Sequence, residues 1–198
     1  PFDESAVDLL ESLGCPFYKV ASFELTDLPL IKYIAQTKKP IILSTGMANQ
    51  KEIKEALDTI QTNGSGDFIL LHCVSGYPTP VEEINLDTIT LLKKKFQCEV
   101  GLSDHTLGNT SAILSIALGA KVIEKHFTFD RSEGGPDAEF SMEPHELKDL
   151  SESISLAHKA IGVGSFEMKS AEESNTKFRR SIYVVNDIKK GDVFTKEN

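Results

Sequence analysis

The feature that most constrains the fold is a regular alternation of short apolar runs with amphipathic helical patterns. Five runs are almost continuously hydrophobic, which is typical of parallel strands covered on both faces. They are Tyr18–Ser22, Ile41–Thr45, Phe68–Cys73, Glu99–Ser103 and Val122–Phe127. Helical patterns separate them, one opening with the capping-box spacing of Asn49 and Glu52. The sequence therefore predicts an α/β fold with repeated βα units around a parallel sheet.

The spacing of these runs indicates the kind of sheet. The units recur at roughly 25 residues, which suits a TIM (β/α)8 barrel, although periodicity alone leaves an open sheet as an alternative. A barrel of this kind has about eight strands, and the sequence offers five. The chain enters a helix directly from a Pro-Phe-Asp loop. We therefore expect that a strand before this helix is missing and that residues 1–162 form a partial barrel domain.

The pattern changes after Gly162. Residues 163–177 are polar and rich in Ser and Glu, which predicts a linker. Phe178–Val185 has a strand-like composition and is followed by a turn. We expect residues 178–198 to be the opening of a further domain.

Charge and cysteine content exclude several classes of function. The formal net charge of −9 argues against general nucleic-acid binding and against binding to anionic membranes. No apolar run approaches the ~20 residues of a membrane span, and no secretion signal opens the chain. Three cysteines without CxxC spacing indicate a reduced, cytoplasmic protein, in which we expect Cys73 and Cys98 to pack as small hydrophobic side chains.

Two histidines lie where neighbouring strands end. In parallel α/β proteins, ligands bind at the carboxyl ends of strands, and His105 and His126 lie at the ends of consecutive strands. Neighbouring strands are about 4.8 Å apart, so the two imidazoles can share a divalent ion. The alternative is a pair of hydrogen-bonded histidines at a rim. Glu124 shares the face of His126 and is a candidate interior partner, whereas Lys125 has the opposite parity and is expected to face the helices.

A second group of polar residues ends the other strands. Lys19, Ser22, Ser44 and Ser103 would surround the same edge of the sheet with hydroxyl and ammonium donors, which suits a phosphate or carboxylate. The alternative is that each serine simply ends a strand before a turn.

Further candidates lie in the adjoining loops. Glu24 and Asp137 are candidate acid/base groups or contacts to a polyhydroxylated ligand, and Tyr77 lies in a loop stiffened by Pro78 and Pro80. Loop residues exposed to water are the alternative for both carboxylates.

Ordered motifs give the chain a resemblance to a known family. They are Tyr18-Lys-Val-Ala-Ser-Phe-Glu24, Ile42-Leu-Ser-Thr-Gly46, Leu70-Leu-His-Cys73, Gly101-Leu-Ser-Asp-His-Thr-Leu-Gly108 and Glu124-Lys-His-Phe127. Together they resemble the sialic acid synthase family, which makes nonulosonic acids and includes pseudaminic and legionaminic acid synthases.

The resemblance implies a TIM barrel followed by a small antifreeze-protein-like (SAF) domain, in a homodimer that exchanges this domain. It implies condensation of phosphoenolpyruvate with an N-acylated amino sugar, such as N-acetylmannosamine or a diacetamido-trideoxyhexose, and release of phosphate. His105 and His126 match ligands of a divalent metal, usually Mn²⁺, with Mg²⁺ or Co²⁺ as alternatives. The matches to contacts with phosphoenolpyruvate are Lys19, Ser22, Ser44, Ser75 and Ser103. The matches to the catalytic contacts with the acceptor sugar are Glu24, Tyr77 and Asp137.

Two positions depart from the neuraminate branch of this family. Ser75 replaces an Asn contact, and Ala138 replaces a His after Gly-Pro-Asp. The resemblance also implies that three barrel strands lie outside these residues, so we expect residues 1–198 alone to be aggregation-prone and inactive. The alternatives are an inactive synthase-like scaffold or another phosphoenolpyruvate-dependent 3-deoxy-sugar-acid synthase.

Overall fold

The computed structural model describes residues 1–64 and 66–198. The chain divides into two units, Pro1–Gly162 and Val163–Asn198, which are described separately. None of the helices in the described part of the chain has the length and apolar content needed to cross a membrane.

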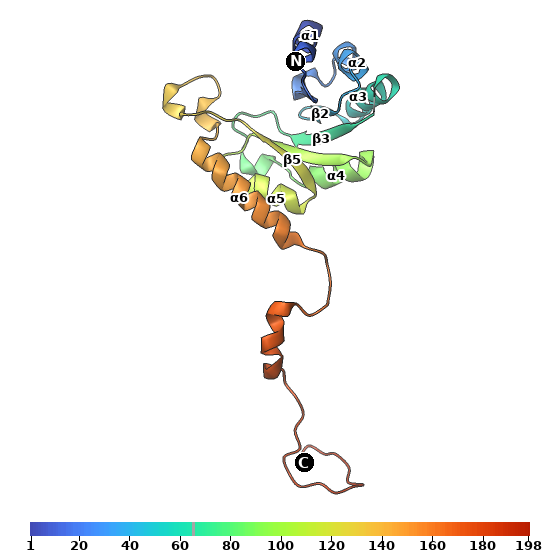
Figure 1. The fold of residues 1–198 in the computed structure, drawn as a ribbon, viewed down its shortest axis with the longest axis vertical. Helices are drawn as coiled ribbons and strands as arrows, with labels where there is room; N and C mark the ends of the chain where they lie inside the picture. The colour runs from blue at the N-terminus through green and yellow to red at the C-terminus, as the bar shows by residue number, and fades with distance from the viewer. Residues whose placement is uncertain (65) are drawn as a thin grey trace. The chain divides into compact units, whose positions relative to one another are not determined.

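The first unit is built on one parallel sheet, as the apolar runs predict (Figure 1). Its strands lie in chain order and each pairs with its sequence neighbour. They are β1 (Tyr18–Val20), β2 (Ile41–Ser44), β3 (Phe68–Cys73), β4 (Glu99–Asp104) and β5 (Ala120–Lys125). All five carboxyl ends therefore lie along one edge, where the predicted polar residues are concentrated.

Helices connect the strands in the order expected of βα units. They are α1 (Glu4–Ser12), α2 (Leu28–Gln36), α3 (Gln50–Asn63), α4 (Thr88–Phe96), α5 (Thr110–Ala117) and α6 (Pro144–Ile161). The predicted capping box at Asn49 and Glu52 is confirmed, because each side chain accepts a hydrogen bond from the other residue's backbone N–H.

The core lies between the sheet and the helices. Val20, Leu43, Leu70 and Leu102 point from successive strands into this layer, and all four are fully buried. Truncating a side chain such as Leu70 to Ala would cost about 2–5 kcal/mol of stability. A smaller cluster joins α5 and α6 through Ala112, Met142 and Leu150.

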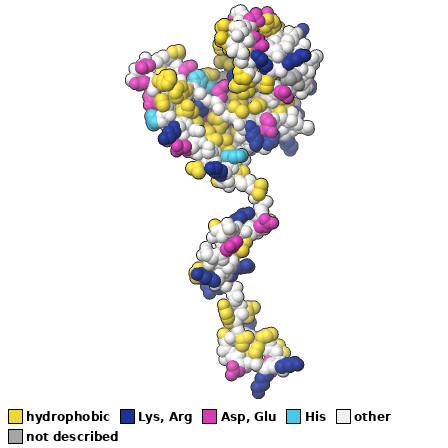
Figure 2. Space-filling view, viewed as in Figure 1, with side chains coloured by type: hydrophobic (Ala, Val, Ile, Leu, Met, Phe, Trp, Pro, Cys, Tyr) yellow, Lys and Arg dark blue, Asp and Glu magenta, His cyan; other side chains and the backbone are white. Residues whose placement is uncertain are grey.

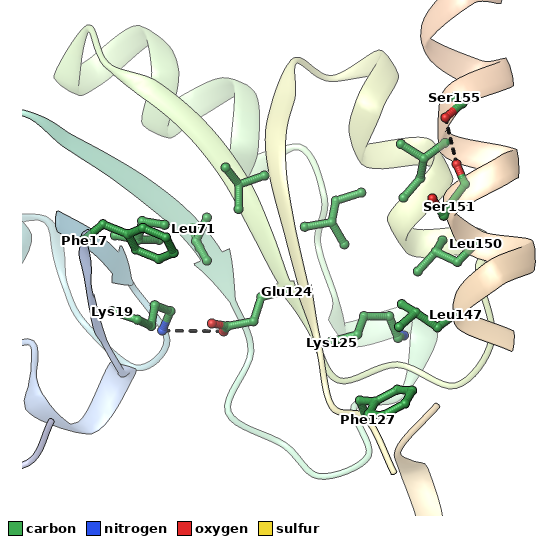
Figure 3. A pocket seen from close by; sticks show the side chains of 14 residues that line it. Phe17, Lys19, Leu71, Glu124, Lys125, Phe127, Leu147, Leu150, Ser151 and Ser155 are labelled. Carbon is green, nitrogen blue, oxygen red and sulfur yellow. Dashed lines mark hydrogen bonds and ion pairs between the residues drawn. The ribbon is translucent and has the colours of Figure 1, made fainter. Parts of the chain in front are cut away.

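The opposite face of the sheet is only partly covered. An ion pair crosses it, with Lys19 Nζ on β1 lying 3.5 Å from Glu124 Oε1 on β5 (Figure 3). A cavity of about 500 Å³ runs from this face along β5 to α6. Hydrophobic side chains gather in the middle of this unit between charged ones (Figure 2). The sheet therefore presents an accessible, mixed apolar and charged face beside its polar edge.

Several predicted boundaries shift. β1 ends at Val20, and Ser22 to Glu24 form the 3-10 turn η1 (Ser22–Glu24). β5 starts at Ala120 and ends at Lys125, so His126 follows the strand instead of lying within it.

The second unit differs more from the prediction. Part of the expected linker is the 3-10 helix η5 (Ser170–Phe178). The predicted strand at 178–185 is wrong, because these described residues form no strand pairing in the structure. A strand requires a pairing partner and a buried face. Here Ile182 and Tyr183 are exposed, and Val185 N–H donates to the carbonyl of Asn198.

Candidate functional site

The two histidines predicted from adjacent strands do come together. Their ring centroids are 5.2 Å apart with an interplanar angle of 62°. The Nδ1 atom of the buried His105 lies 2.8 Å from the carbonyl oxygen of Val74, so Nδ1–H donates, and in the neutral ring Nε2 keeps its lone pair. The Nδ1 atom of His126 lies 3.4 Å from Asp137 Oδ2.

Aromatic rings enclose this pair. The ring of Tyr77 is centred 4.3 Å from that of His105 and 5.8 Å from that of His126. The ring of Phe140 lies 5.0 Å from His126 and 5.8 Å from Tyr77. The structure thus brings His105, His126, Tyr77 and Asp137 together, and adds Phe140, which the sequence analysis missed.

The two imidazoles differ in their protonation equilibria. Burial, reinforced by the nearby His105, lowers the pKa of His126, which favours its neutral ring. Burial also lowers the pKa of His105, but hydrogen bonding to Cys73 and to the Val74 carbonyl outweighs it and the net direction is upward.

Cys73 is buried, as predicted, and its thiol also makes polar contacts that the sequence analysis did not anticipate. Its Sγ is 3.4 Å from Ser22 Oγ and 4.0 Å from His105 Nδ1. Burial raises the pKa of this thiol, but hydrogen bonding to His105 and Ser22 outweighs burial and lowers it overall. Cys98, in contrast, is half-buried against the core as expected.

The serines converge beside the histidines around Gly46. Ser22 Oγ accepts a hydrogen bond of 3.1 Å from Gly46 N–H. A Cβ atom placed on Gly46 would lie 2.5 Å from Ser75 Oγ and 2.8 Å from Ser22 Oγ. The backbone of Gly46 therefore packs closely against these hydroxyl groups, and we call the group of Gly46, Ser22, Ser44 and Ser75 the serine recess.

Several buried polar atoms at this edge lack a protein partner. Within residues 1–64 and 66–198, Glu24 Oε2, Ser44 Oγ and Ser75 Oγ are buried without a hydrogen bond. Buried polar groups are normally paired, and unpaired ones mark places that water or a ligand fills. These three atoms therefore make this edge of the sheet a candidate binding site, with strand-ending serines as the alternative.

Ser103, Glu124 and Lys19 form a connected polar chain. Ser103 Oγ donates to Glu124 Oε1 over 2.7 Å, and Glu124 in turn pairs with Lys19. As predicted, Glu124 lies on the face of the sheet opposite the helix-covered core, where its partners are Ser103 and Lys19.

A second group of candidate metal ligands in the described part of the chain lies at the start of α6. Glu143, His145 and Glu146 at the start of α6 bring three candidate ligand atoms within 4.8 Å of one another. Both carboxylates already accept hydrogen bonds, Glu143 from Arg131 N–H and Glu146 from the Arg131 guanidinium and Glu143 N–H. This group is better explained as the capping of α6.

Comparisons with known proteins agree on the ancestry of the chain. It is 46% identical over 201 residues to N,N'-diacetyllegionaminic acid synthase of Campylobacter jejuni, covering 100% of this chain and 60% of that protein. It is 40% identical over 198 residues to a pseudaminic acid synthase of Campylobacter jejuni, covering 100% of this chain and 58% of that protein.

A solved structure gives the same result. The N-acetylneuraminic acid (sialic acid) synthetase of Leptospira borgpetersenii, in complex with citrate, matches with a TM-score of 0.83 and 36% identity, covering 90% of this chain and 62% of that one. The chain thus spans about three fifths of the length of these relatives. The NeuB family model matches residues 1–166, and the chain accordingly belongs to the NeuB family.

Proposed function

We propose that the intact protein carrying this chain condenses phosphoenolpyruvate with an N-acylated amino sugar and releases phosphate, forming a nonulosonic acid. One observation carries this proposal: the His105–His126 pair, 5.2 Å between ring centroids, adjoins the recess with unpartnered Ser44 and Ser75 hydroxyls. Imidazoles that can bind a metal thus lie beside hydroxyl groups that can bind an anion, which suits a reaction that joins a carbonyl compound to a phosphorylated one. The synthase names of the relatives support it.

In this proposal, the serine recess and Lys19 hold phosphoenolpyruvate. Hydroxyl donors and an ammonium group satisfy the oxygens of a phosphate and a carboxylate, and such charge-assisted hydrogen bonds are the stronger kind. The residues are Lys19, Ser22, Ser44, Ser75 and Ser103. Their role is to fix the position of the enol carbon and to stabilise charge as it develops.

The histidine pair fits a divalent metal. The Val74 carbonyl accepts from His105 Nδ1–H and leaves Nε2 as a free donor atom, which is the usual outer-shell arrangement of a ligating histidine. The lowered pKa of His126 also favours the neutral ring that metal binding requires. A metal held there, Mn²⁺ in our proposal, would supply Lewis-acid polarisation of the sugar aldehyde.

The remaining polar groups act on the acceptor and on protons. Tyr77 and Asp137, beside the histidines, would bind hydroxyl groups of the sugar, with Phe140 excluding water. The enol carbon bonds to the aldehyde carbon, whose oxygen gains a proton and becomes a hydroxyl group. Water then adds to C2, Glu24 accepts its proton in this proposal, and phosphate leaves as the C2–O bond breaks.

We further propose that strands outside these residues complete an eight-stranded barrel with the five described here. The partly covered face around Lys19 and Glu124 would then become the barrel interior. In the same proposal, residues 178–198 open a SAF domain that two subunits exchange in a homodimer.

Phosphate release tests the activity directly. The intact protein is incubated with Mn²⁺ and phosphoenolpyruvate, with and without N-acetylmannosamine or a diacetamido-trideoxyhexose. We expect release only when an acceptor sugar is present, and we expect His105→Ala and His126→Ala to abolish it while weakening Mn²⁺ binding. Equal phosphate release without any sugar, or none with every sugar, would refute the proposal.

A further inference from the structure

The last cross-strand pair of the β4–β5 ladder is charged and buried. Asp104 and Lys125 are register partners, and Lys125 Nζ donates to Asp104 Oδ2 over 2.9 Å. Their side chains are 0% and 4% exposed. Glu124 points toward Lys19, whereas Lys125 extends to the other side of β5, toward α6 (Figure 3). The ion pair therefore lies on the face of the sheet opposite the candidate site.

Every polar group of this ion pair has a partner. Lys125 Nζ also donates to the carbonyl oxygens of Thr106, at 2.8 Å, and Gly108, at 3.1 Å. Asp104 Oδ1 accepts hydrogen bonds from both N–H and Oγ1 of Thr106. A buried ion pair repays its desolvation only with such complete hydrogen bonding. Lys125 thus ties the loop that follows β4 to the end of β5.

The position of this ion pair in the sequence connects it to the site. His105 directly follows Asp104, and His126 directly follows Lys125. Because successive side chains of a strand alternate between faces, a contact that fixes Asp104 to Lys125 on one face also fixes the two backbones that carry the histidines on the other.

The backbone hydrogen bonds of the two histidines connect different segments from those that the Asp104–Lys125 pair connects. The His105 carbonyl accepts from Thr79 N–H at 3.0 Å, and the His126 carbonyl accepts from Met142 N–H at 2.8 Å. Each of these bonds holds one histidine to its own neighbouring loop. The last pair of the β4–β5 ladder and the ion pair between its side chains, in contrast, join the two histidine-bearing segments to each other.

We propose that Asp104 and Lys125 are positioning residues, which set the separation of His105 and His126 for joint coordination of a divalent metal. This inference rests on the proposed function, because it assumes that the histidines bind a metal. It adds that the spacing of the ligands is imposed from the opposite face of the sheet.

Metal titration of the intact protein tests the proposal. The variants are Lys125→Met and the double variant Asp104→Asn/Lys125→Met, which leaves no buried charge unpaired. Lys121→Met is the matched control, since Lys121 is exposed four residues earlier on the same strand. We expect Mn²⁺ affinity to fall about 10–100-fold in both test variants, as when an outer-shell partner of a ligand is lost, and to stay unchanged in the control. The visible absorption bands of bound Co²⁺ should shift in the same two variants.

Folding is monitored by circular dichroism below each melting temperature. If Lys125→Met fails to fold, the double variant decides. A folded double variant with wild-type Mn²⁺ affinity and an unchanged Co²⁺ spectrum would overturn the inference, and so would an unfolded one, because the ion pair would then serve folding rather than ligand placement. If the wild-type protein itself fails to bind Mn²⁺, the proposed metal site is overturned as well. This result is distinguishable from a failure of the positioning inference alone, in which the wild-type protein still binds Mn²⁺.

Discussion

Substitution of Gly46 by alanine is expected to displace hydroxyl groups of the serine recess while leaving the fold intact. The added Cβ would lie 2.5 Å from Ser75 Oγ, 2.8 Å from Ser22 Oγ and 3.2 Å from Cys73 Sγ. These atoms are the ends of side chains, which can rotate away, and Gly46 is not among the glycines with positive φ. We therefore expect the free energy of unfolding to change by about 1 kcal/mol or less.

The effect on ligand binding should be much larger. A hydrogen bond to a charged group contributes about 1.5–3 kcal/mol, and about 1.4 kcal/mol corresponds to a factor of ten in affinity. Turning one hydroxyl of Ser22 or Ser75 away from the recess should therefore weaken phosphoenolpyruvate binding roughly 10- to 150-fold. Calorimetric titration of the intact protein measures this change, and thermal unfolding checks the fold.

Gly76→Ala provides the matched control. The nearest atom to a Cβ at Gly76 is Thr79 Oγ1 at 3.6 Å, which is ordinary contact. We expect this variant to bind phosphoenolpyruvate like the wild type. A folded Gly46→Ala variant with the wild-type dissociation constant would refute the assignment of the recess to this anion.

Two further predictions concern stability. A Cβ on Gly101 would lie 2.3 Å from the backbone oxygen of Val122 and 2.5 Å from Leu71 Cδ2. Gly101→Ala should therefore lower the free energy of unfolding, measured by urea denaturation, by about 1–3 kcal/mol or more. An unchanged denaturation midpoint would contradict this. Burial lowers the pKa of His72, despite the 2.6 Å contact of its Nε2 with the Ile84 carbonyl. The native state therefore binds fewer protons than the unfolded chain, and the free energy of unfolding should fall as the pH drops below about 6.5. The fall should be less steep in His72→Gln.

The parallel sheet and the histidine pair could be predicted from sequence because both depend on local patterns. Near-continuous apolar runs identify buried parallel strands, and the order of βα units places their carboxyl ends together. His105 lies just beyond one such run and His126 near the end of the next, so the pairing of consecutive strands places them together at the same edge.

Phe140 could not be predicted in the same way. It lies in the long loop between β5 and α6, where no period relates one residue to the next. Its position depends on two 3-10 turns, η3 (Arg131–Glu133) and η4 (Ala138–Phe140), and on the bridge between Phe127 and Met142. Only the folded loop brings this ring against His126.

Cys73 is buried as expected, but its polar contacts were not predicted although a usable signal was present. It ends the apolar run of β3, where a small hydrophobic side chain is expected. Its register partner is Ser103, which had already been placed at the candidate site. Register partners on adjacent strands face the same way, so the thiol could have been assigned to the site from the pairing of β3 with β4.

The alternation of faces at the ends of β4 and β5 restricts how this region can diverge. Ser103-Asp104-His105 and Glu124-Lys125-His126 each place an interior residue, a buried ion-pair residue and an imidazole in succession. Insertion or deletion of one residue within either triplet would turn every following side chain to the other face, moving an imidazole among the helices and a charge into the recess. Within these triplets, variation is therefore confined to substitution.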